Sequence, residues 1–106
     1  MTQEYRFDLD LKDRVTIPAK VRKGLGSQLI LCLAPDDERG LNAFTPEAWQ
    51  AFMKLTDAQS LTAQQRFMMM HAEVVEIDNQ GRIHIPQCYI EALHIERAVT
   101  IWFMFG

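Results

Sequence analysis

The sequence contains only two cysteines and five glycines among its 106 residues, and it lacks the motifs of most enzymes. Cys32 and Cys88 belong to no CxxC motif and have no histidine pair nearby. We therefore expect two buried thiols rather than a disulfide or a metal site. No glycine-rich phosphate loop, nucleophile elbow or metal-ligand constellation occurs. These absences indicate a protein that is not an enzyme and uses no cofactor.

Long hydrophobic runs are missing as well. No segment approaches the roughly 18 uninterrupted apolar residues that a membrane-spanning helix needs, and the polar residues 1–6 do not resemble a signal peptide. With 48% apolar residues, the chain can bury one modest core but not two independent ones. We expect a single soluble, cytoplasmic domain over residues 1–106, with no membrane partner and no small-molecule substrate.

An overall excess of positive charge is also absent, because the net charge is -3. The charges are nevertheless unevenly distributed. Residues 1–26 contain six basic and four acidic side chains, a balance of +2, whereas residues 27–106 contain five basic and ten acidic side chains, a balance of -5. If part of the chain contacts a polyanion, the first 26 residues are the best candidate.

What the chain does contain is one nine-residue motif in two copies. Residues 10–18 read DLKDRVTIP, and residues 78–86, which follow 68 positions later, read DNQGRIHIP. Such a repeat predicts a pseudo-two-fold fold in which each copy supplies half of one core. We place repeat one at about 5–49, a helical connector at about 45–71 and a truncated repeat two at about 73–106.

Alternating apolar and polar residues predict that each copy forms a hairpin of two strands. In the turns, Gly81 suits a left-handed backbone position, and its counterpart Asp13 tolerates one at some cost. Alternate residues of each second strand are expected to face the core. The residues expected to point outward are Arg14, Thr16, Arg82 and His84.

Each copy ends in Ile-Pro, and this predicts a helix after each motif. Pro18 and Pro86 suit the first position of a helix, where a missing N–H leaves no hydrogen bond unmade. We expect short helices over residues 19–22 and 87–93. Apolar strands over residues 29–33 and 99–105 are expected to follow.

The connector is predicted to contain two helices. Thr45 and Pro46 are typical of a helix start, and a second helix is expected over residues 60–70. The three consecutive methionines 68–70 indicate adaptable packing rather than a cofactor site, and the acidic residues 36–38 are expected to lie in a solvated loop. The apolar stripe expected on the first helix consists of Trp49, Phe52 and Met53.

The doubled DxxxR motif with Ile-Pro, a short helix and a helical insert resembles the MraZ family, within the AbrB and SpoVT-like swapped-hairpin group. The resemblance covers about residues 5–105. It implies a mainly β fold with short helices (α+β), in which interlocked hairpins form a pseudo-two-fold β-barrel of the double-ψ or AbrB-like kind. It also implies a nucleoid-associated regulator, usually a repressor, that binds double-stranded DNA at short direct repeats upstream of cell-division and cell-wall genes. The family forms ring-like homo-oligomers.

Two groups of residues follow from the motif and from the charges. Residues 65–72 match the inter-repeat helix of the family. The motif residues expected to be structural are Asp10, Pro18, Asp78, Gly81 and Pro86. The residues expected to bind DNA, through phosphates or base edges, are Lys12, Arg14, Thr16, Lys20, Arg22, Lys23, Arg82 and His84.

Structural explanations exist for the same side chains. Each motif arginine could pair with the aspartate of its own turn, and the basic residues of the first helix could simply be solvated. The second copy has fewer basic groups, so we expect the first copy to contact DNA more than the second. The replacements in the second copy are Gln80 for Lys12, Gln87 for Ala19 and Ile90 for Arg22.

A different class of function is a protein-interaction module on the same fold, antitoxin-like and without strong DNA binding. The acidic balance of residues 27–106 is compatible with it. The apolar residues 101–105 also favour it, because an uncovered strand of this kind would bind a partner.

Overall fold

The structure is a computed structural model that describes residues 2–34, 40–55 and 62–105. Its strands are β1 (Thr2–Asp8), β2 (Arg14–Thr16), β3 (Gln28–Leu33), β4 (Gly40–Phe44), β5 (Glu73–Glu76), β6 (Arg82–His84) and β7 (Ala98–Met104). Its helices are α1 (Ala19–Arg22), α2 (Pro46–Leu55), α3 (Ala63–Met70) and α4 (Gln87–Ala92). The prediction of a mainly β, α+β fold with short helices is confirmed.

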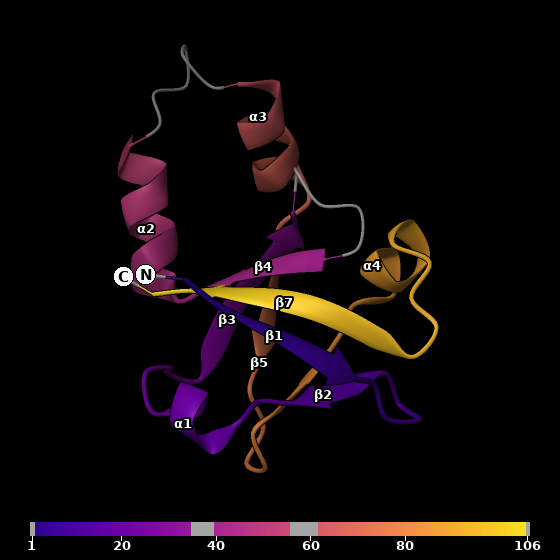
Figure 1. The fold of residues 1–106 in the computed structure, drawn as a ribbon. Coiled ribbons are helices and arrows are strands. Elements are labelled where there is room, and N and C mark those ends of the chain that lie inside the picture. Colours follow the sequence, from indigo (N-terminus) through magenta and orange to yellow (C-terminus); the bar gives the residue numbers. More distant parts are fainter. Residues whose placement is uncertain (1, 35–39, 56–61, 106) are drawn as a thin grey trace.

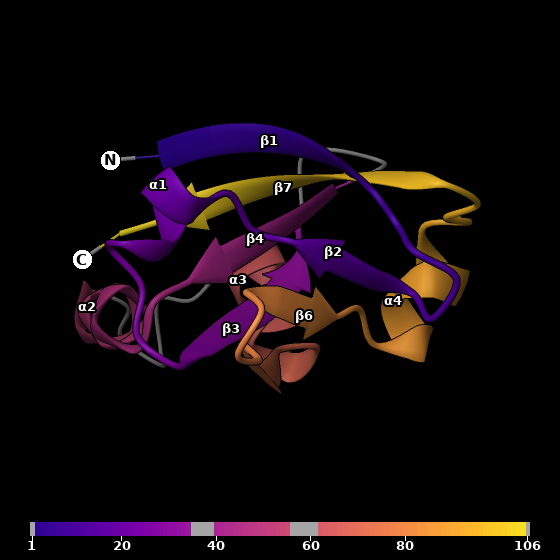
Figure 2. The same cartoon turned by 90° about the horizontal axis from the view of Figure 1, so that it is seen from below.

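The strands are arranged in two sheets. Five of them form an open sheet in the order β1-β7-β4-β3-β5, and β2 and β6 form a separate two-stranded ribbon. Helices α2 and α3 lie at one end of the molecule, and α1 and β2 lie at the opposite end (Figure 1). Figure 2 shows β2 and β6 side by side, with α1 beyond one end of the ribbon and α4 beyond the other.

Both predicted turns are present. The backbone N–H of Asp10 donates a hydrogen bond to the carbonyl of Arg14 (2.9 Å), and the N–H of Asp78 donates to the carbonyl of Arg82 (2.9 Å). Each turn therefore reverses the chain as the motif predicts. The strands that leave it, however, do not stay together.

The predicted hairpins are wrong in their strand pairing. β1 pairs with β7, β5 pairs with β3, and β2 pairs with β6, so each motif strand is bonded to the other copy. The physical reason is the shared core, because each copy buries its apolar side chains against those of the other. Phe7 thus lies opposite Val99, and Val75 lies opposite Leu29.

Strand β4 was not predicted from the sequence. It runs parallel to β7 and antiparallel to β3, and all five of its residues are buried. A Cβ atom at Gly40 would lie 2.2 Å from the ring of Trp102, so only glycine fits beneath this indole. The segment Gly-Leu-Asn-Ala-Phe shows neither alternation nor β-branched residues, and these are the signals that identify strands.

The prediction that residues 101–105 form an uncovered strand is wrong. β7 lies between β1 and β4 and is hydrogen-bonded on both edges. Ile101 and Phe103 are completely buried. The strand is apolar because it crosses the middle of the sheet.

The main core takes matched residues from both copies. Val15 and Ile83 lie opposite each other in the ribbon, and each is 1% exposed. Val21 of α1 and Tyr89 of α4 occupy the same position of their copies, and both are buried. Both copies therefore contribute buried residues at matching positions to one core.

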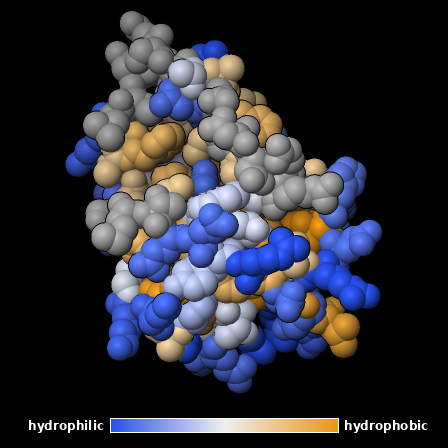
Figure 3. Space-filling view, in the orientation of Figure 1, coloured by the Kyte–Doolittle hydropathy of each residue, from blue (hydrophilic) through white to orange (hydrophobic). Residues whose placement is uncertain are grey.

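A second apolar cluster lies beneath α2 and α3. It contains Phe44 of β4, Met68 of α3 and the partly buried Trp49 and Phe52 of α2. Met53 is more exposed, so the predicted stripe on α2 is narrower than expected. Figure 3 shows hydrophobic side chains between α2 and α3 on the visible face, whereas the rim around α1 and β2 is mostly hydrophilic.

Helix starts follow the capping residues. Thr45 accepts a hydrogen bond from the N–H of Ala48 (3.1 Å) at the start of α2, as predicted. Thr62 and Gln65 form a capping box, so α3 begins at Ala63; the predicted start at residue 60 lies outside the described residues. The placement of the prolines was wrong by one position, because Pro18 and Pro86 are N-caps in extended conformation.

The two cysteines differ in their surroundings. Cys32 is fully buried, and burial raises the pKa of its thiol to about 12. Cys88 is exposed, so the prediction of two buried thiols is wrong for this residue. On α4 the buried side is occupied by Tyr89, and the preceding residue faces outward.

The acidic residues 36–38 lie outside the described residues. In the part of the chain that the structure describes, no helix is long and apolar enough to cross a membrane.

Candidate nucleic-acid interface

The first motif turn is organised by one carboxylate. Oδ1 of Asp10 accepts hydrogen bonds from the backbone N–H groups of Lys12 (2.8 Å) and Arg14 (2.9 Å). Its Oδ2 accepts from Nε of Arg14 (2.8 Å). Asp10 therefore fixes both the turn and the direction of the arginine side chain.

The second motif turn repeats this geometry. Asp78 accepts hydrogen bonds from the N–H groups of Gln80 and Arg82 and from Nε of Arg82, each at 2.9 Å. The predicted pairing of each motif arginine with its own aspartate is confirmed. Only Nε is engaged in each case, and the Nη groups of Arg14 and Arg82 make no hydrogen bond to the described residues.

Both aspartates are held in the charged form. The N–H of Arg14, as the largest cause, lowers the pKa of Asp10 below its usual value of 3.8. The N–H of Arg82 does the same for the pKa of Asp78. A carboxylate stabilised in this way presents its negative charge to the turn, and the arginine beside it offsets that charge.

The turns also contain the two predicted left-handed residues. Asp13 has a φ of 59° and Gly81 a φ of 79°. This conformation has no steric cost for glycine but strains a residue with a Cβ atom. The two turns thus share one backbone conformation, and Asp13 carries the strain that Gly81 avoids.

The β2–β6 ribbon places the predicted outward residues on one surface. In its register Arg14 lies opposite His84, and Thr16 lies opposite Arg82. Thr16 and His84 are exposed, and the arginine side chains are about a quarter exposed, at 26% and 27%. These four residues form the outer face, while the residues between them point into the core.

Each end of the ribbon combines the turn of one copy with the helix of the other. The N–H of Ile17, just before α1, donates to the carbonyl of Gly81 (2.8 Å). The N–H of Ile85, just before α4, donates to the carbonyl of Asp13 (2.9 Å). We name these regions the Gly81 end (residues 19–23 and 78–82) and the Asp13 end (residues 10–14 and 87–91).

The two ends differ in charge. The Gly81 end contains four basic side chains and one acidic side chain, a balance of +3. The Asp13 end contains two basic and three acidic side chains, a balance of -1. Grouping the charges by copy had associated the basic first helix with Arg14, but the fold brings that helix to the second turn and Arg82.

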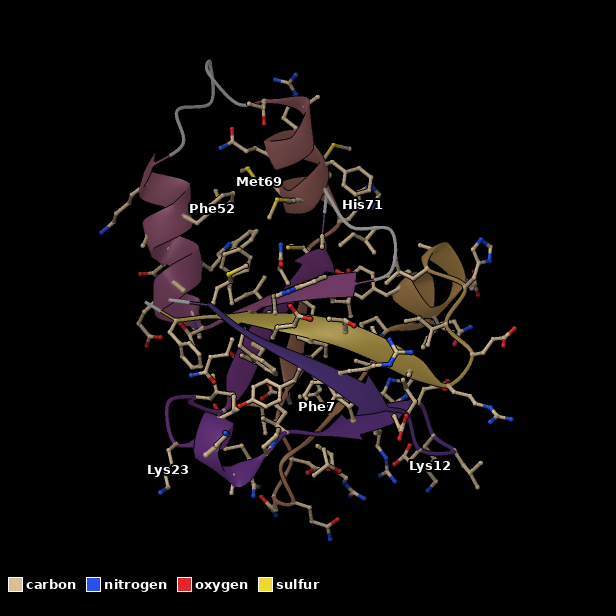
Figure 4. All side chains as sticks on the ribbon, in the orientation of Figure 1. Phe7, Lys12, Lys23, Phe52, Met69 and His71 are labelled. Atoms are coloured by element: carbon tan, nitrogen blue, oxygen red, sulfur yellow. The ribbon has the colours of Figure 1, made fainter. Side chains whose placement is uncertain are left out.

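The basic groups predicted from the first copy do not form one patch. Lys12 and Lys23 lie on opposite sides of the molecule (Figure 4). Within α1 the side chains also diverge, because Nζ of Lys20 lies 6.0 Å from the ring centre of Tyr5 and Arg22 lies against Gly81. Of the eight predicted DNA-binding residues, the structure places Arg22 against Gly81, the residue before Arg82, and pairs Arg14 with His84 and Thr16 with Arg82 on the ribbon.

Two contacts were missed in the sequence. One is the approach of Arg22 to Gly81, for which the only signal was a glycine at a turn position of the second copy. The other is the buried hydroxyl of Tyr89, whose single proton is shared between the carbonyl oxygens of Leu31 (2.9 Å) and His71. Burial raises the pKa of Tyr89 above its usual value, so the hydroxyl keeps its proton and can act as this donor.

The remaining histidines have structural positions. His71 is the C-cap of α3, just before β5, and its ring centre lies 4.6 Å from that of Phe67. His94 has a φ of 52° just after α4. No group of three or more potential metal ligands occurs in the described ranges.

Comparison with known proteins identifies the family. "Transcriptional regulator MraZ" of Acetivibrio thermocellus is 38% identical over 104 residues, a match that covers 92% of this chain and 71% of the relative. The chain belongs to the MraZ family. The proteins of the same name from Treponema denticola (37% identity, covering 95% of this chain and 74% of the relative) and Leuconostoc mesenteroides (34%, covering 92% and 71%) are similar to it as well.

A family model described as "MraZ protein, putative antitoxin-like" matches residues 68–105. This range contains the second motif, its Asp-Arg pair and β7. In this member of the MraZ family the first motif, outside that range, has the same turn geometry. The resemblance seen in the doubled motif is confirmed.

Proposed function

We propose that the protein is a transcriptional regulator that binds double-stranded DNA with the outer face of the β2–β6 ribbon. The residues proposed to contact DNA are Lys12, Arg14, Thr16, Lys20, Arg22, Lys23, Arg82 and His84. As in the family, the expected targets are short direct repeats upstream of cell-division and cell-wall genes, the expected effect is repression, and the expected location is the nucleoid in the cytoplasm.

The outer face of the ribbon is the observation that carries this proposal. The major groove of B-DNA admits a two-stranded ribbon. Here the ribbon presents Arg14 and Arg82 with their Nε atoms fixed by aspartates. A guanidinium held in this way has lost part of its rotational freedom before binding, and its Nη groups suit phosphate oxygens or guanine edges.

The charge of the two ends suggests how the ribbon is oriented. The Gly81 end, with its balance of +3, suits phosphate contact better than the Asp13 end, with its balance of -1. We therefore expect the Gly81 end to contribute more to affinity. This order replaces the expectation that the first copy, including Arg14, dominates.

Useful affinity for DNA requires an oligomer, because a single subunit has few basic side chains with which to contact phosphates. Binding of several subunits to adjacent repeats multiplies a weak affinity without any new contact. We propose that the chain acts as one domain of two interlocked repeats, that its two sheets form the swapped-hairpin barrel of the family, and that it assembles into a ring-like homo-oligomer. Edge strand β5 and helix α3, where Val74 and Met70 are 63% and 79% exposed, offer a surface for this assembly.

A binding titration tests the proposal. The purified chain is titrated against a duplex with short G-rich direct repeats and against a scrambled duplex, at several salt concentrations between about 50 and 200 mM. We expect tighter binding to the repeats and an affinity that falls steeply with salt. Equal affinity for both duplexes, or no dependence on salt, contradicts the proposal.

An antitoxin-like protein-interaction module is the second candidate. The family description and the exposed apolar residues Phe67, Met70 and Val74 favour it, whereas β7 no longer does, because it is covered on both edges. A stoichiometric protein partner together with no shift of any duplex would favour this function over the first.

A further inference from the structure

The guanidinium of Arg22 rests on the second motif turn. A Cβ atom built on Gly81 would lie 2.1 Å from Nη1, 2.5 Å from Cζ and 2.6 Å from Cδ of Arg22. Any side chain at position 81 would therefore displace the arginine. Gly81 is needed for its positive φ of 79° and, independently, for this contact.

The matching place at the other end of the molecule is built differently. The counterpart of Gly81 is Asp13, which has a Cβ atom, and the counterpart of Arg22 is Ile90, which packs against the main core. The chain thus combines arginine with glycine at one end and isoleucine with aspartate at the other. Because the two turns share their backbone hydrogen bonds, the difference lies in the side chains alone.

The guanidinium of Arg22 is incompletely satisfied by the protein. Its Nε is buried and has no hydrogen-bond partner among the described residues, so a ligand could be bound only through its Nη groups. The guanidinium of Arg22 contacts Gly81, the residue before Arg82. The Nε of Arg82 in turn donates a hydrogen bond to Asp78. Two guanidinium groups from different copies therefore lie at one turn, with a single carboxylate to offset them.

We propose that Arg22 and Arg82 form one phosphate-binding site that is assembled from both copies, with Gly81 as the seat that positions Arg22. The ligand is a phosphate group of the DNA backbone, so the site rests on the proposed DNA-binding function. Planar guanidinium groups bind phosphate oxygens through two parallel hydrogen bonds, which a flexible lysine does not reproduce. The Asp13 end has no such site.

Matched variants of the 106-residue chain test the proposal. Arg22→Ala and Arg22→Lys are compared with the parent for affinity to the direct-repeat duplex over a range of salt. Lys54→Ala is the control, because it removes one exposed cation from α2 at the opposite end of the molecule. Thermal unfolding of each variant establishes that it is folded.

We expect Arg22→Ala to weaken DNA binding by about tenfold, as for the loss of one charge-assisted hydrogen bond, and to reduce the slope of affinity against salt by about one unit. Arg22→Lys should recover less than half of this loss on a logarithmic scale, and Lys54→Ala should behave like the parent. A folded Arg22→Ala variant with parental affinity, or full recovery by lysine, overturns the site. If the parent itself does not bind DNA, the proposed function fails together with the site.

A transplant provides the converse test. The double variant Asp13→Gly/Ile90→Arg copies the arrangement to the Asp13 end. We expect its DNA affinity to rise above that of the parent by more than the rise from Asp13→Gly alone. Equal affinities of the folded single and double variants would show that glycine at this turn position does not place the arginine for phosphate binding, and would overturn the proposal.

Discussion

The Gly81 end and the Asp13 end share one backbone and differ in almost every exposed side chain. Both have the same turn hydrogen bonds within about 0.1 Å and the same Asp-Arg ion pair. Their charge balances nevertheless differ by four units, +3 against -1. Duplication of a motif therefore preserved the residues that fold the turn and left its surface free to diverge.

The comparison also shows that charge must be assigned in space rather than along the chain. Residues 1–26 carry the positive balance, but their helix α1 lies beside the turn of the second copy. A variant of one copy consequently affects a surface that belongs to both.

The largest expected difference between the two ends concerns their buried helix residues. Tyr89 of α4 corresponds to Val21 of α1, so Tyr89→Val gives both helices the same residue at this buried position. We expect the free energy of unfolding to fall by about 3 kcal/mol, because a cavity forms and the hydroxyl hydrogen bonds are lost. Val21→Ala should cost about 1–2 kcal/mol. Urea denaturation measures both values.

Tyr89→Phe separates the two causes, because it removes the hydroxyl and keeps the ring. It should cost about 1–2 kcal/mol. If Tyr89→Val were no more costly than Val21→Ala, the larger side chain and the hydroxyl of Tyr89 would add nothing to the stability that α4 contributes.

The turn residues should respond in opposite directions. Gly81→Ala introduces a Cβ atom at a positive φ and against Arg22, and should lower the free energy of unfolding by about 1–3 kcal/mol. Asp13→Gly relieves strain at φ 59° and should change stability by less than about 1 kcal/mol, because glycine also makes the unfolded chain more flexible. Thermal unfolding of both variants checks this, and a stabilising Gly81→Ala would be the contrary outcome.

A smaller difference is expected between the two motif arginines. Arg82→Ala should reduce the affinity for direct-repeat DNA by about tenfold, the cost of a charge-assisted hydrogen bond. Arg14→Ala should reduce it by only about threefold, because its contribution is screened and offset by neighbouring acidic groups. Fluorescence anisotropy at one fixed salt concentration measures both, and the reverse order would transfer the main contact to the Asp13 end.

The smallest difference is expected for acid sensitivity, where the two ends should agree. Because the folded-state pKa values of Asp10 and Asp78 lie below their usual value of 3.8, these carboxylates stabilise the fold above that pH. Their contribution is lost as the pH falls through the lowered values. Asp10→Asn and Asp78→Asn should weaken this dependence to the same extent in unfolding curves between pH 5 and about 2. Unequal effects would show that the two carboxylates contribute differently to stability although their hydrogen bonds are the same.

The local features of the fold could be predicted from the sequence. Alternation identified the buried faces of β2 and β6, the spacing of the motif predicted the pairs of Arg14 with Asp10 and Arg82 with Asp78, and Thr45 predicted the start of α2. Each of these depends on residues close in sequence, for which period and capping are sufficient signals.

The strand partners could not be predicted. A period of two shows which side of a strand is buried but not which strand lies beside it. Pairing between strands that are adjacent in sequence was therefore predicted, whereas the strands pair between the two copies. β4 was missed because its burial comes from its central place in the sheet rather than from its composition. The contact of Arg22 with Gly81 depends on the pairing of strands between the two copies, so it could not be predicted either.

The ladder between β1 and β7 pairs Thr2 with Met104, and this pairing affects how the protein folds as it is synthesised. On the ribosome, β1 emerges first and has no partner strand until β7 has been synthesised. The closing of so long a loop is entropically costly, and pairings of high sequence separation form slowly. We therefore expect the first repeat of this member of the MraZ family to complete its fold only after β7 has been synthesised, and to expose its apolar residues until then.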